Sequence, residues 1–272
     1  MPILENGMSV WPERFPDTEV DAMRRRAGPA KFNSQMMLEP VNIAEGRLDP
    51  SLLTRYGGAL RMSDELKGLY LEGERLVSAS AWWDPAFGRG SGDSSVLAAV
   101  FTDRDGVRYL HRVAYLDAPL PDEEDEAARQ CRLVAEIVRD LHLPFVAVEI
   151  NGIGKFLPAI LRRELAKANA LCAVREMSST RAKELRILES FDVVLAARLL
   201  RVHEDVYKTP FITEMQEWRP GRNSRDDGLD AVAGALSLEP VRLQRLPPAS
   251  GSPGWRGTAR THQADTDFDP LP

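Results

Sequence analysis

The chain has 272 residues, of which 43% are hydrophobic and 28% are charged, a composition typical of a folded globular protein. The 41 Asp and Glu residues outnumber the 35 Lys and Arg residues, and the net charge of −6 argues against a protein coated in positive charge for wrapping nucleic acid. No apolar run reaches the roughly 18 residues of a membrane span, and the N-terminal residues lack a signal-peptide pattern, so we expect a cytoplasmic protein. The two cysteines, Cys131 and Cys172, have no disulfide or zinc spacing, which fits a reducing compartment.

Three regions follow one another along the chain. Residues 1–75 place prolines around one short helical stretch at 17–27, which predicts a connecting or docking arm. Residues 76–239 alternate β-prone and helical patterns and form the predicted folded domain. Residues 240–272 are rich in Pro, Gly, Ser and Thr, which predicts a disordered tail.

The folded domain opens with three β-prone runs, at 78–84, 94–102 and 107–116. The Asp105-Gly106 turn favours a tight hairpin between the last two, so we expect three consecutive antiparallel strands. From residue 121 onward helices and strands alternate, which predicts a mixed sheet with helices on its faces. The predicted elements there are a helix from Pro121, a strand at 144–150, a helix at 156–169, a strand at 171–176 and helices at 182–191 and 223–236.

Two acids stand at or near the ends of predicted strands. Asp84 precedes Pro85, which terminates strand pairing because it lacks an N–H, and an Asp-Pro pair here is by itself typical of an ordinary turn. Glu149 is more informative because the run 144–150 reads as a buried strand. An ionised Glu there costs several kcal/mol unless it is paired or metal-bound, so Glu149 predicts a partner.

The last predicted helix begins with a cluster of acids. Asp226 and Asp227 suit the positive end of the helix dipole, so capping explains both. Asp230 lies past that turn, at i,i+4 and i,i+3 spacings that destabilise a helix by roughly 0.2–0.5 kcal/mol per like-charged pair. A divalent cation would reverse this repulsion. With the two strand acids, Asp230 completes an oxygen-rich set of the kind that Mg²⁺ or Mn²⁺ prefers. Two such ions about 3.5–4 Å apart serve phosphoryl transfer or hydrolysis.

The segments around these acids resemble the nuclease domain of bacteriophage terminase large subunits, which package and cut viral DNA. The segments are WWDPAFGRGSGDSS at 82–95, FVAVEINGIG at 145–154 and TPFITEMQEWRPGRNSRDDGLDAVAGAL at 209–236. The earlier RFPDTEV and KFNSQMMLEPV also resemble the segment that joins the terminase ATPase to its nuclease. The resemblance covers residues 11–239, with the motifs in the family's order.

This resemblance implies an RNase H-like α/β fold, with three leading antiparallel strands in a central mixed sheet flanked by helices. It also implies an endonuclease that cuts double-stranded DNA with two Mg²⁺ or Mn²⁺ ions. Asp84 would bridge both ions, and Glu149 and Asp230 would be further catalytic ligands. Asp226 and Asp227 match the extra acids of the last motif, and we expect one of them to assist metal binding.

The chain departs from the family because it contains no P-loop pattern GxxxxGK[ST], so we expect no ATP hydrolysis. The chain is then a fragment or split gene, or its ATPase is on another polypeptide. The portal protein and the small terminase subunit are the further partners that the resemblance implies, in the cytoplasm of a bacterial host.

The basic face of the helix around 182–191 is our preferred DNA-contacting element, with Arg181, Lys183 and Arg186 on it. Lys155 is a further candidate for a phosphate contact, although a solvated lysine also explains it. Two other functions stay open at this point. One is a junction resolvase or transposase-like enzyme of the same fold. The other is a remnant that binds portal or small terminase subunit without cutting DNA.

Overall fold

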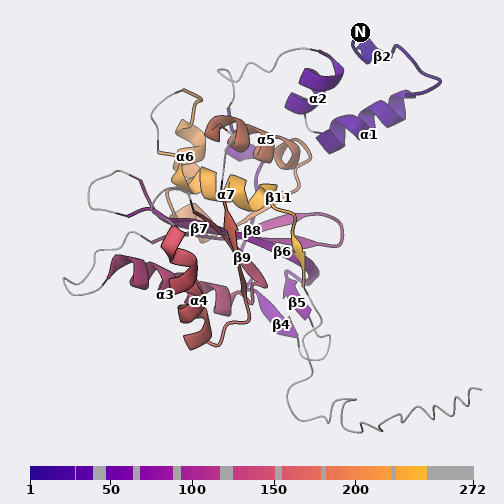
Figure 1. Ribbon diagram of the computed structural model, residues 1–272. Helices are drawn as coiled ribbons and strands as arrows, with labels where there is room; N and C mark the ends of the chain where they lie inside the picture. Colours follow the sequence, from indigo (N-terminus) through magenta and orange to yellow (C-terminus); the bar gives the residue numbers. More distant parts are fainter. Residues whose placement is uncertain are drawn as a thin grey trace, which may run out of the picture.

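The apolar runs of the chain form one mixed β-sheet with helices on both faces (Figure 1). In the computed structural model, the described residues are 1–27, 29–38, 47–63, 68–87, 93–116, 125–150, 155–178, 182–221 and 225–243. Within these ranges, no helix combines the length and the apolar character needed to cross a membrane.

The described part of the chain contains seven α-helices, two short 3-10 turns and twelve strands. The helices are α1 Asp17–Ala27, α2 Pro29–Met36, α3 Glu126–Asp140, α4 Leu157–Lys167, α5 Lys183–Ala196, α6 Phe211–Glu217 and α7 Asp227–Ser237, and the 3-10 turns are η2 Pro50–Leu52 and η4 Val206–Lys208. The strands are β1 Leu4–Glu5, β2 Met8–Ser9, β3 Thr54–Tyr56, β4 Arg61–Ser63, β5 Gly68–Leu71, β6 Glu74–Asp84, β7 Val96–Asp103, β8 Arg108–Tyr115, β9 Phe145–Glu149, β10 Ala173–Met177, β11 Leu200–His203 and β12 Val241–Arg242.

The strand order of the main sheet is β10-β9-β6-β7-β8-β11-β3. Strands β6, β7 and β8 are antiparallel neighbours, as predicted, while β9 pairs parallel with β6 and β10 pairs parallel with β9. Three consecutive antiparallel strands extended by parallel strands and covered by helices confirm the predicted RNase H-like fold.

The two faces of the sheet carry separate cores, because side chains along a strand alternate between faces. On β6, Trp82 belongs to the core covered by α5, α6 and α7, and Trp83 belongs to the core covered by α3 and α4. Figure 1 shows these two groups of helices on opposite sides of the sheet. Beyond the register shift between Leu76 and Ser78, alternate residues of β6 therefore face α7, and Asp84 shares that face with Trp82.

Helix α7 packs unusually close to β6 at Gly234. A Cβ atom at this position would lie 2.4 Å from Cδ2 of the Trp82 indole, so no larger residue fits without a shift. Asp230 lies four residues before Gly234, on the same side of the helix. The contact between Gly234 and Trp82 thus brings Asp230 over the end of β6, where Asp84 lies.

Some boundaries differ from the sequence prediction. Helix α3 begins at Glu126, where the side chain of Asp125 accepts a hydrogen bond from the Ala127 N–H, and residues 117–124 around Pro121 lie outside the described residues. Strand β12 shows that the segment predicted as a tail begins with a short strand paired with β6, whereas residues 244–272 lie outside the described residues.

The main sheet also takes in residues from the segment predicted as an arm. Strand β3 pairs with β11 and strand β5 pairs with β6, so the sheet begins before residue 76. Tyr56 and Leu71 are buried in the core on the α3–α4 side, which explains why these short strands dock there. The predicted helix α1 is present, and α2 follows it directly.

Candidate metal centre

Asp84 and Glu149 meet because they end two neighbouring parallel strands. The register that pairs Trp82 with Ala147 and Trp83 with Val148 leads directly to Asp84 and Glu149 as the next residues of each strand. Trp82 and Ala147 both belong to the core under α7, so the two acids, two residues further on, project toward that helix. Glu149 is 8% exposed, and Asp84 is partly buried.

Asp230 approaches the same point from α7. Its side chain is buried, and its backbone N–H donates to the Asp226 carbonyl in the first turn of the helix. One carboxylate oxygen from each of Asp84, Glu149 and Asp230 lies within 4.8 Å of the others. We call these three residues the carboxylate triad, and they are the three acids that the sequence singled out as principal ligands.

The surroundings of Asp84 in the triad change its pKa. Burial, followed by the charges of Asp230 and Glu149, raises the pKa of Asp84 to about 8, and the nearby cations only partly oppose this. Without a further positive charge, Asp84 therefore holds a proton at neutral pH. This is the behaviour expected of carboxylates gathered around a position that suits a cation.

Two cations from α5 face the triad. Arg186 donates to Asp230 through Nη2, and its Nη1 lies 3.6 Å from a carboxylate oxygen of Glu149. Lys183 Nζ lies 2.7 Å from Asp226 and 3.5 Å from Asp230. Burial alone would lower the pKa of Lys183, but the charge of Asp230 and the contact with Asp226 outweigh it and raise the pKa.

The predicted DNA-contacting residues thus divide into three groups. Lys183 and Arg186 are drawn into ion pairs with the acids, and the side chain of Arg186 is only 10% exposed. Lys155 is exposed at the start of the segment that leads into α4. Arg181 lies outside the described residues.

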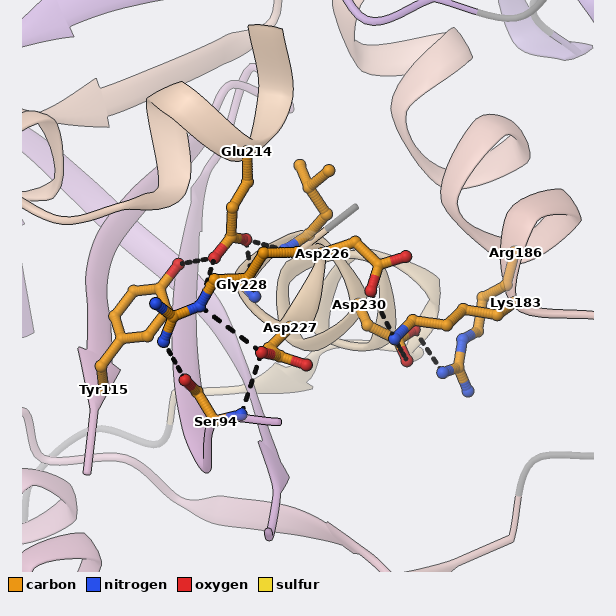
Figure 2. Close-up of polar contacts among 11 residues, drawn as sticks. Ser94, Tyr115, Lys183, Arg186, Glu214, Asp226, Asp227, Gly228 and Asp230 are labelled. Carbon is orange, nitrogen blue, oxygen red and sulfur yellow. Dashed lines mark hydrogen bonds and ion pairs between the residues drawn. The ribbon is translucent and has the colours of Figure 1, made fainter. Parts of the chain in front are cut away.

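The two acids that open α7 point in different directions, and neither lies in the triad. Figure 2 shows Asp226 and Asp230 on the side of Lys183, whereas Asp227 faces Ser94. Asp227 accepts a hydrogen bond of 2.9 Å from the Ser94 N–H and lies 3.8 Å from Arg225 Nε. Asp227 therefore ties the start of α7 to the segment that precedes β7.

The sequence analysis missed the acid on the other side of α7. Glu214 of α6 is 3% exposed and accepts hydrogen bonds from the Tyr115 hydroxyl and from the Gly228 and Leu229 N–H groups (Figure 2). We call Glu214, Tyr115, Asp227, Ser94 and Arg225 the capping network. The sequence signal that points to it is Gly228, a glycine inside the first turn of an otherwise well-formed helix.

The chemistry of the triad fits a divalent cation. Three carboxylates from three separate elements offer hard oxygen ligands, which Mg²⁺ and Mn²⁺ prefer. Two nitrogens of the Arg186 guanidinium, Nε and Nη1, are buried beside the triad without a hydrogen-bond partner among the described residues. The guanidinium therefore compensates the charge of the three carboxylates with only part of its hydrogen-bonding capacity. A metal ion coordinated by the carboxylates would compensate that charge more directly.

The chain was compared with protein families, curated proteins and solved structures. No protein-family model and no curated protein matches the chain. It is similar to the nuclease domain of the large terminase subunit of bacterial virus Sf6, at 12% identity and a TM-score of 0.42 over 60% of this chain and 89% of that chain. It is similar to the yeast mitochondrial Holliday junction resolvase at 9% identity and a TM-score of 0.37, over 59% of this chain and 76% of that one. It is also similar to Thermus thermophilus RuvC in complex with a Holliday junction substrate, at 15% identity and a TM-score of 0.34, over 58% of this chain and 90% of that one.

Proposed function

We propose that this chain is the metal-dependent endonuclease of a phage or prophage DNA-packaging terminase and that it hydrolyses phosphodiester bonds of double-stranded DNA. The observation that carries the proposal is the carboxylate triad, in which Asp84, Glu149 and Asp230 converge at the end of two parallel strands under one helix. The ordered motifs that resemble those of terminase nuclease domains support the packaging role.

In this proposal Asp84, Glu149 and Asp230 would hold two Mg²⁺ or Mn²⁺ ions. Of the two further acids, Asp226, which contacts Lys183 beside Asp230, is the one that would assist. When bound, such a pair of ions supplies an activated water and stabilises the leaving oxygen. The chain itself fixes the ligands on the rigid strands β6 and β9 and on α7. Among the described residues, Lys183 and Arg186 contact the triad from α5 and would be the cations available there to an incoming phosphate.

The remaining assignments belong to the same proposal. An ATPase on a separate domain or chain, the portal protein and the small terminase subunit are the partners of a packaging motor in the host cytoplasm. The net charge of −6 predicts weak DNA binding by the isolated chain, with a steep salt dependence that arises from a few Lys and Arg contacts.

A plasmid-nicking assay tests this function. We expect the purified chain to nick plasmid with Mn²⁺ and not with EDTA. Asp84→Ala or Asp230→Ala should abolish nicking while circular dichroism shows a folded chain. Asp140→Asn, which removes an exposed charge at the end of α3, is the matched control and should leave nicking unchanged. Retained cleavage in either triad variant would overturn the site assignment.

The substrate arm of the same assay separates the proposed role from the other two functions. A strong preference for four-way junctions over linear duplex would favour a resolvase. Portal binding without any cleavage or Mn²⁺ binding would instead favour a docking module.

A further inference from the structure

We propose that Glu214 is a positioning residue that fixes the first turn of α7 and thereby the place of Asp230 in the carboxylate triad. This inference rests on the proposed function, because it concerns how the metal site is held in shape. Glu214 acts through α7, since its carboxylate contacts that helix and is not one of the three acids of the triad.

The start of α7 lacks a local cap. The N-cap residue Asp226 makes no side-chain hydrogen bond to the helix. The first N–H groups of any helix have no intrahelical acceptor and need one from elsewhere. One oxygen of Glu214 supplies it, accepting from Gly228 N at 2.9 Å and from Leu229 N at 3.3 Å. The negative charge also suits the positive end of the helix dipole.

Glu214 is itself held in a defined orientation. Its other carboxylate oxygen accepts a hydrogen bond of 2.9 Å from the Tyr115 hydroxyl and lies 3.9 Å from Arg225 Nε. Both oxygens of this buried acid are thus engaged, one by β8 and one by α7. A carboxylate bonded on both sides has little freedom to move, so it transmits the position of β8 to the start of α7.

Gly228 makes this approach possible. A Cβ atom there would lie 2.1 Å from the Tyr115 hydroxyl oxygen and 2.7 Å from the Glu214 carboxylate. Any larger residue at this second position of α7 would have to displace one of these two side chains. The close approach of Glu214 and Tyr115 to the helix backbone therefore favours glycine here.

Asp230 lies in the turn that Glu214 fixes. It follows Gly228 by two residues, and its N–H makes the first helical hydrogen bond, to Asp226 at 2.9 Å. The hydrogen bonds of Glu214 hold this turn from the α6 side, and the ion pairs of Lys183 and Arg186 hold it from the α5 side (Figure 2). Loss of the bonds on the α6 side would let Asp230 shift against the strand acids, and displacements near 1 Å at a site cost about 10²-fold in rate.

Three substitutions of Glu214 separate position from charge. Gln keeps the length and can accept from the two helix N–H groups, but it loses the charge. Asp keeps the charge but is too short to reach them, and Ala loses both. A positioning role predicts that E214Q stays within about threefold of the unchanged chain in Mn²⁺ affinity, whereas E214D and E214A weaken it by about 10- to 100-fold.

The measurements are Mn²⁺ titration by calorimetry and hydrogen exchange of the Gly228 and Leu229 amides, on the full chain and at a temperature where each variant is folded. We expect E214D and E214A to lose amide protection and E214Q to keep it. E214D provides the test even if E214A does not fold. Wild-type Mn²⁺ affinity in E214D, or a loss in E214Q equal to that in E214D, would overturn the inference. An unchanged chain that binds no Mn²⁺ would instead overturn the proposed function, and this inference with it.

Discussion

The carboxylate triad and the capping network lie on opposite sides of the first turn of α7, and both bring buried acids together. They differ in what the carboxylate oxygens contact. In the capping network, backbone N–H groups and a hydroxyl donate to the carboxylates of Glu214 and Asp227. In the triad, the three carboxylates face one another, and cationic side chains from α5 supply the compensating charge.

This difference teaches that a cluster of acids at the start of a helix does not by itself identify ligands. Acids whose oxygens accept from backbone N–H groups act as fasteners, because those oxygens are already held by the backbone of another segment. Acids that face one another retain oxygens for a cation, and in the triad the charges of Asp230 and Glu149 add to burial in raising the pKa of Asp84. The predictions below test this division, beginning with the largest expected effect.

The sharpest contrast is between one acid of each group. Glu149→Gln should lower Mn²⁺-dependent cleavage by about 10³-fold or more, which corresponds to roughly 4 kcal/mol of transition-state stabilisation. Asp227→Asn should lower it by less than about tenfold, because the amide oxygen can still accept from the Ser94 N–H. Single-turnover cleavage rates at saturating Mn²⁺ measure both. Equal losses of cleavage rate in the two variants would show that the two acids do not differ in role.

The packing of α7 on β6 predicts the next largest effect. Gly234→Ala should destabilise the fold by about 3 kcal/mol, because the new methyl group would overlap the Trp82 indole. Urea denaturation measures the loss. Trp82→Leu in the same chain is the control, and in that background the added cost of Gly234→Ala should be smaller. Independent, additive effects of the two substitutions would contradict the proposed contact.

Asp84 predicts a dependence of stability on pH in the metal-free chain. Its pKa is about 8 in the folded state and near 4 when unfolded, so the folded state binds the proton more tightly. This contribution to stability is present at pH 4 and is lost as the pH rises toward 8. In EDTA, Asp84→Asn should match the unchanged chain near pH 4 and exceed it at pH 8 by on the order of 5 kcal/mol. A constant difference between pH 4 and pH 8 would contradict the assigned environment.

The smallest effect belongs to the partly exposed pair at the edge of the site. Asp226→Asn removes the contact of 2.7 Å with Lys183, whose side chain is 40% exposed. We expect a loss of about 1 kcal/mol or less, because water and salt screen such pairs. Thermal unfolding at low and high salt provides the check. The difference in stability between the variant and the unchanged chain should shrink as the salt concentration rises. A difference that does not depend on salt would show that Asp226 does not stabilise the fold through its ion pair with Lys183.

Sequence patterns pointed to two acids of the triad because each breaks a local rule, whereas Asp84 before Pro85 is by itself typical of a turn. Glu149 is a charge inside an apolar strand, and Asp230 is a repelling acid past the helix start. The alternation of strands and helices likewise predicted the antiparallel strands β6 to β8 and a mixed sheet with helices on its faces, since these elements have a clear local period.

Other parts of the molecule depend on contacts between distant segments and could not be predicted in this way. Glu214 reads as an ordinary helix residue until α6 and α7 pack together. Strands β3 and β5 are too short to show a period, and they join the sheet through distant partners. The basic pattern of Lys183 and Arg186 predicts a DNA contact. The pattern does not show that both side chains also form ion pairs with the acids of α7, because that depends on how α5 packs against α7.

Anomalous scattering from a crystal soaked in Mn²⁺ tests the central claim most directly, because it locates the metal without relying on activity. The account predicts anomalous peaks among the carboxylates of Asp84, Glu149 and Asp230, with oxygen ligands at about 2.0–2.3 Å. It predicts no peak between Glu214 and Asp227, because both oxygens of Glu214 and one oxygen of Asp227 already have partners. Metal bound at the capping network, or a triad that stays without metal at saturating Mn²⁺, would contradict it.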